Sequence, residues 1–473
     1  MPYVKCVSTD TFSSVYGLKT CYHSKEQKMN TPIYDYLTKY SESGILRMHM
    51  PGHKGRSSGN ILSNVYPLDI TEITDAGNLF ENDGIISESE KNASRIFGTK
   101  ATFYSVGGST LCIQTMLALM KYDRRNVIAV RNTHRSFLSA CVLLDIDVSW
   151  VYPVYEDSII SGTVLLCDIE EKLKNTSNPC LYITSPDYFG SMADIKSIAE
   201  LCHRYNAVLV VDNAHGACLP FYKENMHPIA LGADMCCDSA HKMLPALTGA
   251  AYLHIGNPAY SSKVKEVMTM FASTSPSYLI MCSLDLCNVF LEDEIKQRLK
   301  SSEKYIACLK RSDALKRFKT EIPEFYSEPL HFTINAQQSG VNGLKLAAML
   351  RKRKIEYEYA DNTHIIMLFS PLDDADVYNR LENVLDSIKF QPSEINNLKI
   401  NFPAPEKYMT IREAALSEYE EIPVEKSGGR VCAAVNVPCP PAIPVVVSGE
   451  IISDECISIM KRFGIEKIKT LKL

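Results

Sequence analysis

The chain has 473 residues and a formal net charge of −5, with 46% hydrophobic and 22% charged residues. This length is enough for two or three domains with a large core, and this composition excludes wholesale disorder. Charges of both signs are dispersed, so nothing favours a nucleic-acid partner, and no apolar run has the length of a membrane span.

The first 28 residues are polar, show little periodicity and lack the continuous apolar core of a signal peptide. We interpret them as a loose extension, and residues 1–60 together as an N-terminal extension and arm. From Thr31 the spacing of apolar residues predicts a short amphipathic helix that Gly44 ends.

The 16 cysteines are scattered, and many stand inside apolar segments. This pattern is typical of reduced, buried thiols in a cytoplasmic protein and not of a disulfide framework. No CxxC pairs with another at zinc-site spacing, so we expect no metal.

From residue 85 to 255, apolar strands alternate with amphipathic helices. A helix is predicted around 86–97, and a strand, a glycine turn and a helix follow over 103–120. Further strands are predicted at 126–130, 148–152, 180–183, 207–211, 234–237 and 250–253. Such alternation predicts an α/β fold with a mostly parallel sheet covered on both faces, and we expect residues 61–310 to form this large domain.

The pattern of predicted helices and strands changes after residue 275. Residues 276–310 predict one long helix, followed by shorter strands at 330–334 and 364–369 and an amphipathic helix near 342–353. We expect residues 311–473 to form a smaller, C-terminal α+β domain.

The glycine turn carries the first chemical motif, Gly107-Gly108-Ser109-Thr110. Two glycines before a helix let the backbone approach an anion, and the free amides and hydroxyls there suit a phosphate. The turn lacks the spacing of a dinucleotide fingerprint, and a plain helix cap is the alternative.

The second motif is Val210-Val211-Asp212-Asn213-Ala214-His215-Gly216, at the carboxyl end of a buried strand, where ligands bind in open α/β sheets. An aspartate there is costly without a cation, and a pyridinium nitrogen is a natural partner. The alternatives are a helix cap for Asp212 and a structural histidine for His215.

The third motif places Lys242 between the apolar runs 235–237 and 243–247. Such surroundings disfavour the charged amine, so the pKa of Lys242 is expected to fall and the neutral amine to become a nucleophile. A surface lysine on a loop is the alternative. A phosphate turn, an aspartate and a lysine, in this order on an α/β sheet, are what an aldehyde cofactor bound as a Schiff base requires.

The order and the residues of these motifs resemble those of the Orn/Lys/Arg decarboxylase family, a group of fold-type-I pyridoxal-phosphate enzymes. The resemblance is to the short form of the family. The matching stretches are HMPGHKG (49–55), DITEITD (69–75), the GGST turn, RNTHRS (131–136), TSPDYFG (184–190), VDNAHGA (211–217), SAHK (239–242), STSPSYL (273–279) and PCPPAIPVVVSGE (438–450). They span about 400 of the 473 residues, from roughly Thr31 to beyond Glu450.

The resemblance implies four residues at the reacting end of the cofactor. Lys242 would be the Schiff-base lysine, and Asp212 would pair with the pyridine nitrogen. His215 would lie near the phenolic oxygen, and His134 would stack on the ring face.

The resemblance also implies a phosphate site and an assembly. Ser109, Thr110, Ser239 and His241 would serve the phosphate, next to Gly108 of the turn. Ser275 would reach the phosphate of the neighbouring subunit, which implies a homodimer or a higher homo-oligomer with the active site at the subunit interface.

The implied activity is decarboxylation of a basic amino acid (arginine, lysine or ornithine) to an amine and carbon dioxide, in polyamine-related metabolism. An aminotransferase of the same fold, with Arg412 or Arg430 receiving a second carboxylate, and a non-catalytic regulator remain as alternatives. The chain departs from the usual family pattern at Asn213, Cys439 and Ala442, where many members have Glu, Tyr and Gly.

Overall fold

The computed structural model describes residues 29–57, 59–155, 161–320, 326–390, 402–435 and 443–472. Contacts divide the chain into residues 1–30 and 31–473, and the fold below is that of the second unit. The predicted N-terminal extension over residues 1–28 lies outside the described residues. Within the described part of the chain, no helix is both long and apolar enough to cross a membrane.

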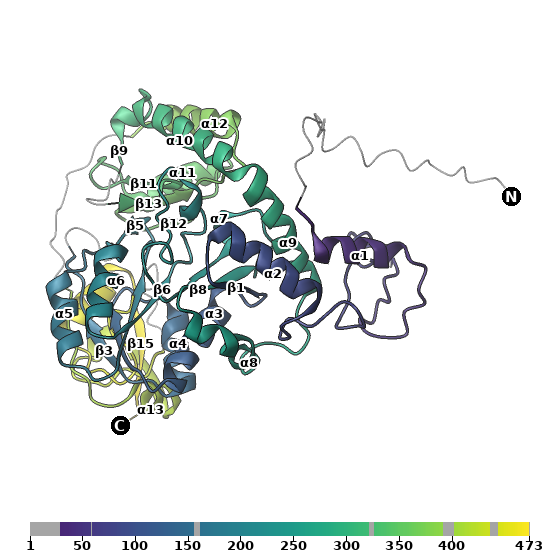
Figure 1. Cartoon of the computed structure of the whole chain (residues 1–473). Coiled ribbons are helices and arrows are strands. Elements are labelled where there is room, and N and C mark those ends of the chain that lie inside the picture. The colour runs from purple at the N-terminus through teal and green to yellow at the C-terminus, as the bar shows by residue number, and fades with distance from the viewer. Residues whose placement is uncertain are drawn as a thin grey trace. The chain divides into compact units, whose positions relative to one another are not determined.

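Seven strands form the central sheet, in the order β1-β8-β7-β6-β4-β2-β3. Of these strands, β1, β3, β6 and β8 are labelled in Figure 1. Their bounds are Ala101–Ser105 (β1), Asn126–Val130 (β2), Val148–Val151 (β3), Pro179–Thr184 (β4), Val208–Asp212 (β6), Met235–Asp238 (β7) and Ala251–Ile255 (β8). Strands β2, β3, β4, β6 and β7 pair in parallel, whereas β8 runs antiparallel to both β7 and β1. The predicted mostly parallel sheet is therefore confirmed.

The two faces of the sheet are covered by different helices. On β4, Cys180 and Tyr182 belong to one core, and Leu181 and Ile183 belong to the other. All four are fully buried, which explains why the strand is apolar throughout. The first face packs against α3 (Gly108–Tyr122), α4 (Arg135–Leu144) and α8 (Val264–Met268), and the second against α5 (Leu166–Lys174) and α6 (Ile195–Arg204).

The amino-terminal helices of the described chain pack on α9 (Tyr278–Asp293). They are α1 (Pro32–Glu42) and α2 (Gly84–Phe97), close to the predicted positions. Asp285 of α9 accepts hydrogen bonds from the backbone N–H groups of Ile33 and Tyr34, at 2.9 and 3.0 Å. This carboxylate accepts from backbone amides that have no partner within α1. Its negative charge also interacts favourably with the positive, amino-terminal end of the α1 dipole.

The prediction of one long helix over 276–310 is wrong. Two helices occupy this stretch, α9 and α10 (Ile295–Arg311), and Glu294 between them leaves the helical conformation with φ −120° and ψ −32°. Three consecutive acidic residues, 292–294, stand at the carboxyl end of α9. Negative charge there opposes the helix dipole, so the break falls where continuation is least favourable.

The chain after residue 311 carries two more sheets. The first has the order β12-β13-β11-β9, with β9 at Lys319–Thr320, β11 at His331–Asn335, β12 at Tyr359–Ala360 and β13 at His364–Leu368, and helices α11 (Gly343–Lys352) and α12 (Ala375–Ser387). The second pairs β14 (Tyr419–Pro423) with β15 (Lys467–Leu471) and has its own core with α14 (Asp454–Arg462). The proposed domain limits at 60/61 and 310/311 stay predictions.

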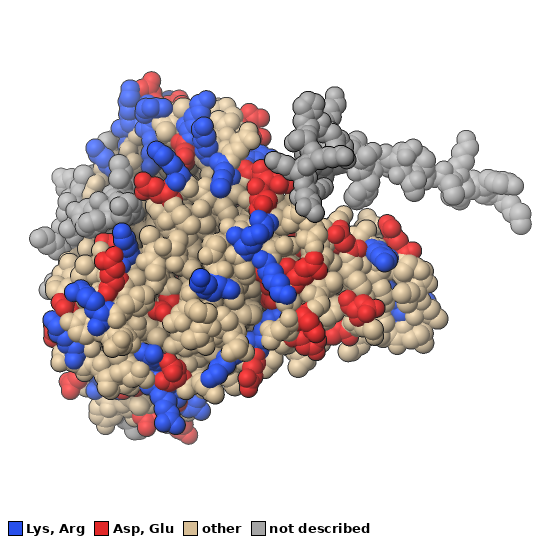
Figure 2. Space-filling model, viewed as in Figure 1, with Lys and Arg blue, Asp and Glu red and all other residues tan. Residues whose placement is uncertain are grey.

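The remaining short elements connect these parts. They are β5 (Ser191–Met192), β10 (Tyr326–Ser327), α7 (Ala240–Met243), α13 (Ile411–Leu416) and the 3-10 turns η1 (Leu219–Phe221), η2 (Pro258–Lys263), η3 (Leu315–Arg317) and η4 (Val424–Lys426). The pairing of β5 with β10 joins the region of the large sheet to that of the second sheet. On the face seen in Figure 2, basic and acidic side chains are interspersed.

A buried ion pair ties the C-terminal region to the large sheet. The Arg131 guanidinium, just after β2, donates two hydrogen bonds to the Glu450 carboxylate, at 2.7 and 2.6 Å, and a third to the carbonyl of Pro444. Arg131 is fully buried and Glu450 is nearly so. A pair of this kind leaves an uncompensated buried charge when one partner is removed.

We expect Glu450→Ala to lower the free energy of unfolding by about 3–5 kcal/mol, because Arg131 then stays buried without a counter-charge. Urea unfolding at neutral pH measures this change. The control is Arg298→Ala, which removes the half-exposed pair between Arg298 and Glu294 and should cost less than ~1 kcal/mol. Equal effects of the two substitutions would contradict the expectation.

Candidate active site

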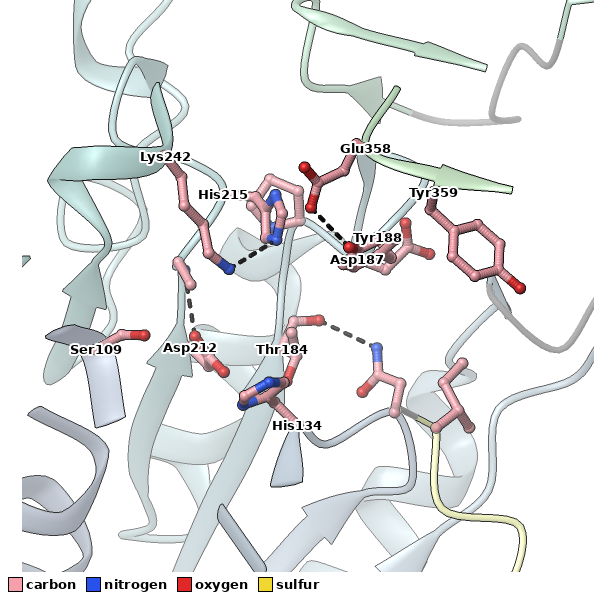
Figure 3. A pocket seen from close by; sticks show the side chains of 14 residues that line it. Ser109, His134, Thr184, Asp187, Tyr188, Asp212, His215, Lys242, Glu358 and Tyr359 are labelled. Atoms are coloured by element: carbon pink, nitrogen blue, oxygen red, sulfur yellow. Dashed lines mark hydrogen bonds between the residues drawn. The ribbon is translucent and has the colours of Figure 1, made fainter. Parts of the chain in front are cut away.

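One pocket lies at the carboxyl edge of the parallel strands, where β2, β4, β6 and β7 end (Figure 3). Its volume is about 420 Å³. It is lined by Ser109, Asn132, His134, Thr184, Pro186, Asp187, Tyr188, Asp212, Ala214, His215, Lys242, Glu358, Tyr359 and Ile443. Five of the predicted site residues are therefore brought together: Ser109, His134, Asp212, His215 and Lys242.

Lys242 enters this pocket from α7, the single turn of helix that follows β7. Its Nζ lies 3.0 Å from His215 Nε2 (Figure 3). Burial lowers the pKa of Lys242, and Asp212 opposes this effect. Burial, and next the charge of Lys242, hold the pKa of His215 well below its usual value. The expected nucleophilic amine therefore has the environment that it needs.

Asp212 ends β6 and is 2% exposed. Its carboxylate accepts hydrogen bonds from the Tyr182 hydroxyl and the Ala214 backbone N–H, both at 3.2 Å. No ion pair between the described residues includes Asp212. A buried carboxylate without a cation is costly, so the position suits a cationic ligand.

His134 is the N-cap of α4, and this fixes its orientation. Its Nδ1 accepts a hydrogen bond from the Ser136 backbone N–H at 3.3 Å and lies 2.8 Å from the Ser136 hydroxyl. Burial lowers the pKa of His134, which favours a neutral imidazole. The ring borders the same pocket as Asp212 (Figure 3).

The predicted phosphate turn joins β1 to α3. Gly108 has φ +66°, a conformation that favours glycine, and α3 begins there without a side-chain cap. A Cβ on Gly108 would stand 3.9 Å from His241 Cε1, so His241 lies beside the turn. His241 Nδ1–H donates to the Ala250 carbonyl at 2.8 Å. Ser239 is fully buried, and its hydroxyl has no hydrogen-bond partner among the described residues.

Five of the predicted cofactor residues do not line the pocket: Gly108, Thr110, Ser239, His241 and Ser275. Thr110 and Ser275 are exposed, and neither lines the pocket. The predicted reach of Ser275 into a neighbouring subunit stays a prediction. Of the three departures from the family pattern, Asn213 donates to Asp238 Oδ1 at 2.7 Å. Cys439 and Ala442 lie outside the described residues.

Several pocket residues were given no role from the sequence, although Asp187 lies in the TSPDYFG stretch named above. Asp187 follows the carboxyl end of β4, so the rule that selected Asp212 also applies to it. Glu358 and Tyr359 come from the second sheet, and no sequence signal connects them to the first. The Tyr188 hydroxyl donates to Glu358 at 2.7 Å, and the Tyr188 ring packs edge-on against His215 at 5.4 Å.

One buried group of side chains has the composition of a metal site. His227, Asp238 and His254 are fully buried and offer ligand atoms within 4.8 Å of one another. Both imidazole Nε2 atoms lie at hydrogen-bonding distance from Asp238 Oδ2, 3.2 and 3.3 Å, and Asn213 donates to Oδ1. His227 and Asn213 supply one donor to each carboxylate oxygen, whereas His254 Nε2 makes no hydrogen bond among the described residues. The Asp238 carboxylate is therefore satisfied by protein donors.

Together, the fold and the pocket define an α/β enzyme with a buried lysine and aspartate at the carboxyl edge of its sheet. Lysine decarboxylase A from Pseudomonas aeruginosa is similar in structure, with a TM-score of 0.79 and 18% identity, over 93% of this chain and 80% of that chain. The lysine decarboxylase LdcF of Francisella novicida has a TM-score of 0.78 and 18% identity, over 93% and 81%. The fold is therefore that of the fold-type-I enzymes.

The family follows from the sequence comparisons. The protein-family model for the Orn/Lys/Arg decarboxylase major domain matches residues 31–333. The family model for the Orn/Lys/Arg decarboxylase C-terminal domain matches residues 399–465. An arginine decarboxylase of Bacillus subtilis (strain 168) is 30% identical over 90% of this chain and 92% of its own. One of Bacillus anthracis is 27% identical over 91% and 92%. The chain belongs to the Orn/Lys/Arg decarboxylase family, which confirms the resemblance seen in its motifs.

The buried carboxyl group of Asp187 leads to a prediction about how the stability of the protein depends on pH. Burial raises its pKa to about 6 from the usual 3.8, although the Phe189 and Ser191 backbone N–H groups donate to it. A raised folded-state pKa contributes stability that is fully present below the unfolded-state pKa and is lost as the pH rises through the folded-state value. Asp187→Asn removes this titration and keeps an acceptor oxygen. The variant should therefore gain stability over the wild type between pH ~4 and ~6, by roughly 3 kcal/mol.

Urea unfolding at a series of pH values measures this gain. Asp386→Asn, at an exposed carboxylate, is the matched control and should follow the wild-type pH dependence. Parallel curves for Asp187→Asn and the wild type would show that Asp187 titrates normally.

Proposed function

We propose that the protein is a pyridoxal-phosphate-dependent decarboxylase with arginine as its substrate. The observation that carries the proposal is the meeting of Lys242 and Asp212 in one buried pocket at the carboxyl edge of the sheet. Arginine is chosen among the basic amino acids because the Bacillus relatives that span about nine-tenths of the chain carry that activity in their names. The amine product would enter polyamine-related metabolism.

The residues present fit this cofactor. Ser239 Oγ is buried without a partner among the described residues, two positions before His241, which lies beside the uncapped start of α3. Hydroxyl and helix N–H groups are thus available for a phosphate. Asp212 is a buried carboxylate that suits a protonated ring nitrogen. When bound, pyridoxal phosphate supplies an electron-withdrawing ring that accepts the electron pair freed as the carboxylate leaves as carbon dioxide.

The protein side chains would act at defined atoms. Lys242 Nζ, whose pKa is lowered by burial, would provide the neutral amine for covalent attachment. Asp212 would keep the proton on the ring nitrogen, which preserves the electron-withdrawing form. His134, oriented by Ser136, would cover one face of the ring and so fix the direction in which the carboxylate is held.

The far end of the pocket suits a cation. Asp187 and Glu358 place carboxylates there, and the Tyr188 and Tyr359 rings lie beside them (Figure 3). A guanidinium is planar, carries five donors and packs on aromatic faces, so these groups can hold it through charge-assisted hydrogen bonds. This arrangement supports a basic side chain in the substrate.

The aminotransferase alternative is not favoured. Arg412 donates to the carbonyls of Val142 and Leu143, and Arg430 pairs with Glu420. Neither arginine lines the pocket, so neither is placed to receive a second substrate carboxylate. A purely regulatory role is also not favoured, since Lys242, Asp212 and His215 meet in a formed pocket.

A homodimer or higher homo-oligomer is part of the proposal. Large apolar side chains are exposed in the segment between α1 and α2, among them Met48 at 82% and Ile61 at 95%. Exposed apolar side chains of this kind are typical of protein interfaces. Ser275 is exposed on the same chain, as contact with a neighbouring subunit requires.

A cytoplasmic location is the last part of the proposal. Every cysteine that the structure describes is free, and all except Cys167 and Cys308 are buried. Reduced, buried thiols are typical of proteins in a reducing compartment.

The assay that tests the activity offers arginine, lysine and ornithine to the protein reconstituted with pyridoxal phosphate. We expect release of carbon dioxide and the matching amine, with kcat/KM for arginine at least about tenfold above that for lysine, a difference of ~1.4 kcal/mol. A site that hydrogen-bonds a guanidinium is left with unpaired groups by an ammonium, which is the physical reason. Formation of a keto acid without gas would refute decarboxylation.

Lys242→Ala tests the attachment point. We expect loss of the near-visible absorption of bound cofactor to the background level, because no other lysine lines the pocket formed by the described residues. The control is Lys196→Ala, at an exposed helix position, which should keep the band at full intensity. A persistent band in Lys242→Ala would place the attachment on another lysine.

A further inference from the structure

Behind Lys242, a chain of hydrogen bonds runs away from the pocket. His215 Nε2 lies 3.0 Å from Lys242 Nζ, and His215 Nδ1 lies 3.2 Å from His331 Nε2. His331 Nδ1 lies 2.7 Å from Glu328 Oε2. His331 and Glu328 do not line the pocket, and the role proposed for Lys242 does not account for them.

The far end of this chain is a satisfied buried carboxylate. Glu328 is fully buried, and it accepts hydrogen bonds from the Tyr222 hydroxyl and the Leu330 backbone N–H, both at 2.9 Å, besides that from His331. Three donors stabilise the ionised form of a carboxylate away from water. Because a carboxylate only accepts, His331 Nδ1 carries a proton.

The proton on His331 Nδ1 determines which atoms donate in the other hydrogen bonds of this series. With its Nδ1 protonated, a neutral His331 accepts at Nε2 from His215 Nδ1–H. A neutral His215 then accepts at Nε2 from the Lys242 ammonium. Every hydrogen bond is satisfied with one positive charge on Lys242 and one negative charge on Glu328.

We propose that His331 and Glu328 are a buried proton store for Lys242. The proton that leaves the Lys242 ammonium moves to His215 Nε2, while the proton on His215 Nδ1 moves to His331 Nε2. The products are a neutral amine at Lys242, a neutral His215 with its tautomer exchanged, and an imidazolium–carboxylate pair between His331 and Glu328. The number of protons and the net charge are unchanged. This inference rests on the proposed function of Lys242 as the attachment point.

The energetics favour this direction of transfer. Before transfer, the positive charge is two imidazole rings away from Glu328. After it, the charged partners are in direct contact at a buried position, where attraction is strong. The pKa of His215 is held well below its usual value by burial and by Lys242, so His215 passes the proton on. Glu328 and His331 are therefore positioning residues that act through His215.

The fold holds the store in place from two sides. His331 begins β11 of the second sheet, and Glu328 follows β10, which pairs with β5 of the large-domain region. The Glu328 backbone N–H donates to the Gly190 carbonyl at 2.8 Å. A Cβ on Gly190, at φ +87°, would stand 2.6 Å from His331 Cβ. Glycine at the end of the TSPDYFG motif thus lets His331 approach His215.

Other charged groups face this chain of hydrogen bonds from neighbouring elements, and all of them except Glu358, which one control replaces, are present in every variant below. They are His134, His241, Asp212 and Glu358 around Lys242 and His215, Asp187 beside His331, and Cys218 and Tyr222 beside Glu328.

The first test measures capture of pyridoxal phosphate by the cofactor-free protein, as the initial rate of rise of near-visible absorbance from pH 6 to 9. In the wild type, the neutral amine forms by internal transfer, so its supply does not require loss of a proton to water. In Glu328→Gln the imidazolium loses its counter-charge, and the amine must lose a proton to water instead. The ratio of variant to wild-type rates, which cancels titration of the probe, should rise about tenfold per pH unit below the pKa of Lys242.

Two matched variants separate the store from general electrostatics. Glu358→Gln removes a carboxylate that faces Lys242 but lies outside the chain of hydrogen bonds, and its ratio to the wild type should stay flat. Glu328→Asp keeps a carboxylate and should restore most of the wild-type profile. A flat ratio for Glu328→Gln, or an equal slope for Glu358→Gln, would overturn the proposal.

The second test needs no cofactor. Nitrogen-15 NMR of histidine-labelled, cofactor-free protein should show an imidazolium at His331 near neutral pH, assigned by its loss in His331→Gln and absent in Glu328→Gln. Neutral His215 and His331 in the wild type from pH 6 to 9 would also overturn the proposal. A wild type that captures no cofactor would instead refute the proposed function, and the NMR result would still decide the store.

Discussion

The structure depends on burying an amine at Lys242 without a carboxylate in direct contact. Removing an ammonium from water is costly, and the contact that Lys242 makes is with a neutral imidazole, His215 Nε2 at 3.0 Å. This surrounding favours the unprotonated amine, which is the reactive form. The three carboxylates of the site, Asp212, Asp187 and Glu358, instead accept hydrogen bonds from protein donors, so the lysine keeps its nucleophilic character.

Three regions of the chain are needed to build this environment. The large sheet supplies Lys242, Asp212 and His134 from the carboxyl ends of β7, β6 and β2. The second sheet supplies Glu358 at the pocket and His331 behind it. The C-terminal region holds Arg131 through Glu450, three residues before His134, so the N-cap of α4 is anchored from the far end of the chain. The pocket is therefore a property of the assembled fold.

Much of the fold was predictable because alternating apolar strands and amphipathic helices leave a clear periodic signal. Every predicted strand of the large sheet is present to within two residues of its expected ends. The helix over 276–310 was not predicted correctly, because apolar spacing continues through the break at Glu294 and the opposing effect of three acidic residues is small. Asp187 was open to prediction from its place after a strand. Glu358 was not, since the alternation of Ile355, Tyr357 and Tyr359 around it indicates a short strand but does not connect that strand to the first sheet.

By itself, the sequence determined the family and the chemical groups: the turn at Gly108, the aspartate at the end of β6 and the lysine after β7 stand at positions set by local periodicity. Only the tertiary structure decided what these groups contact. His215 meets His331 across 116 positions, and Tyr188 meets Glu358 across 170. Such contacts depend on how the second sheet packs against the first, and the pairing of β5 with β10 and the space left by Gly190 fix that packing. No local pattern encodes a distance between two sheets built from different parts of the chain.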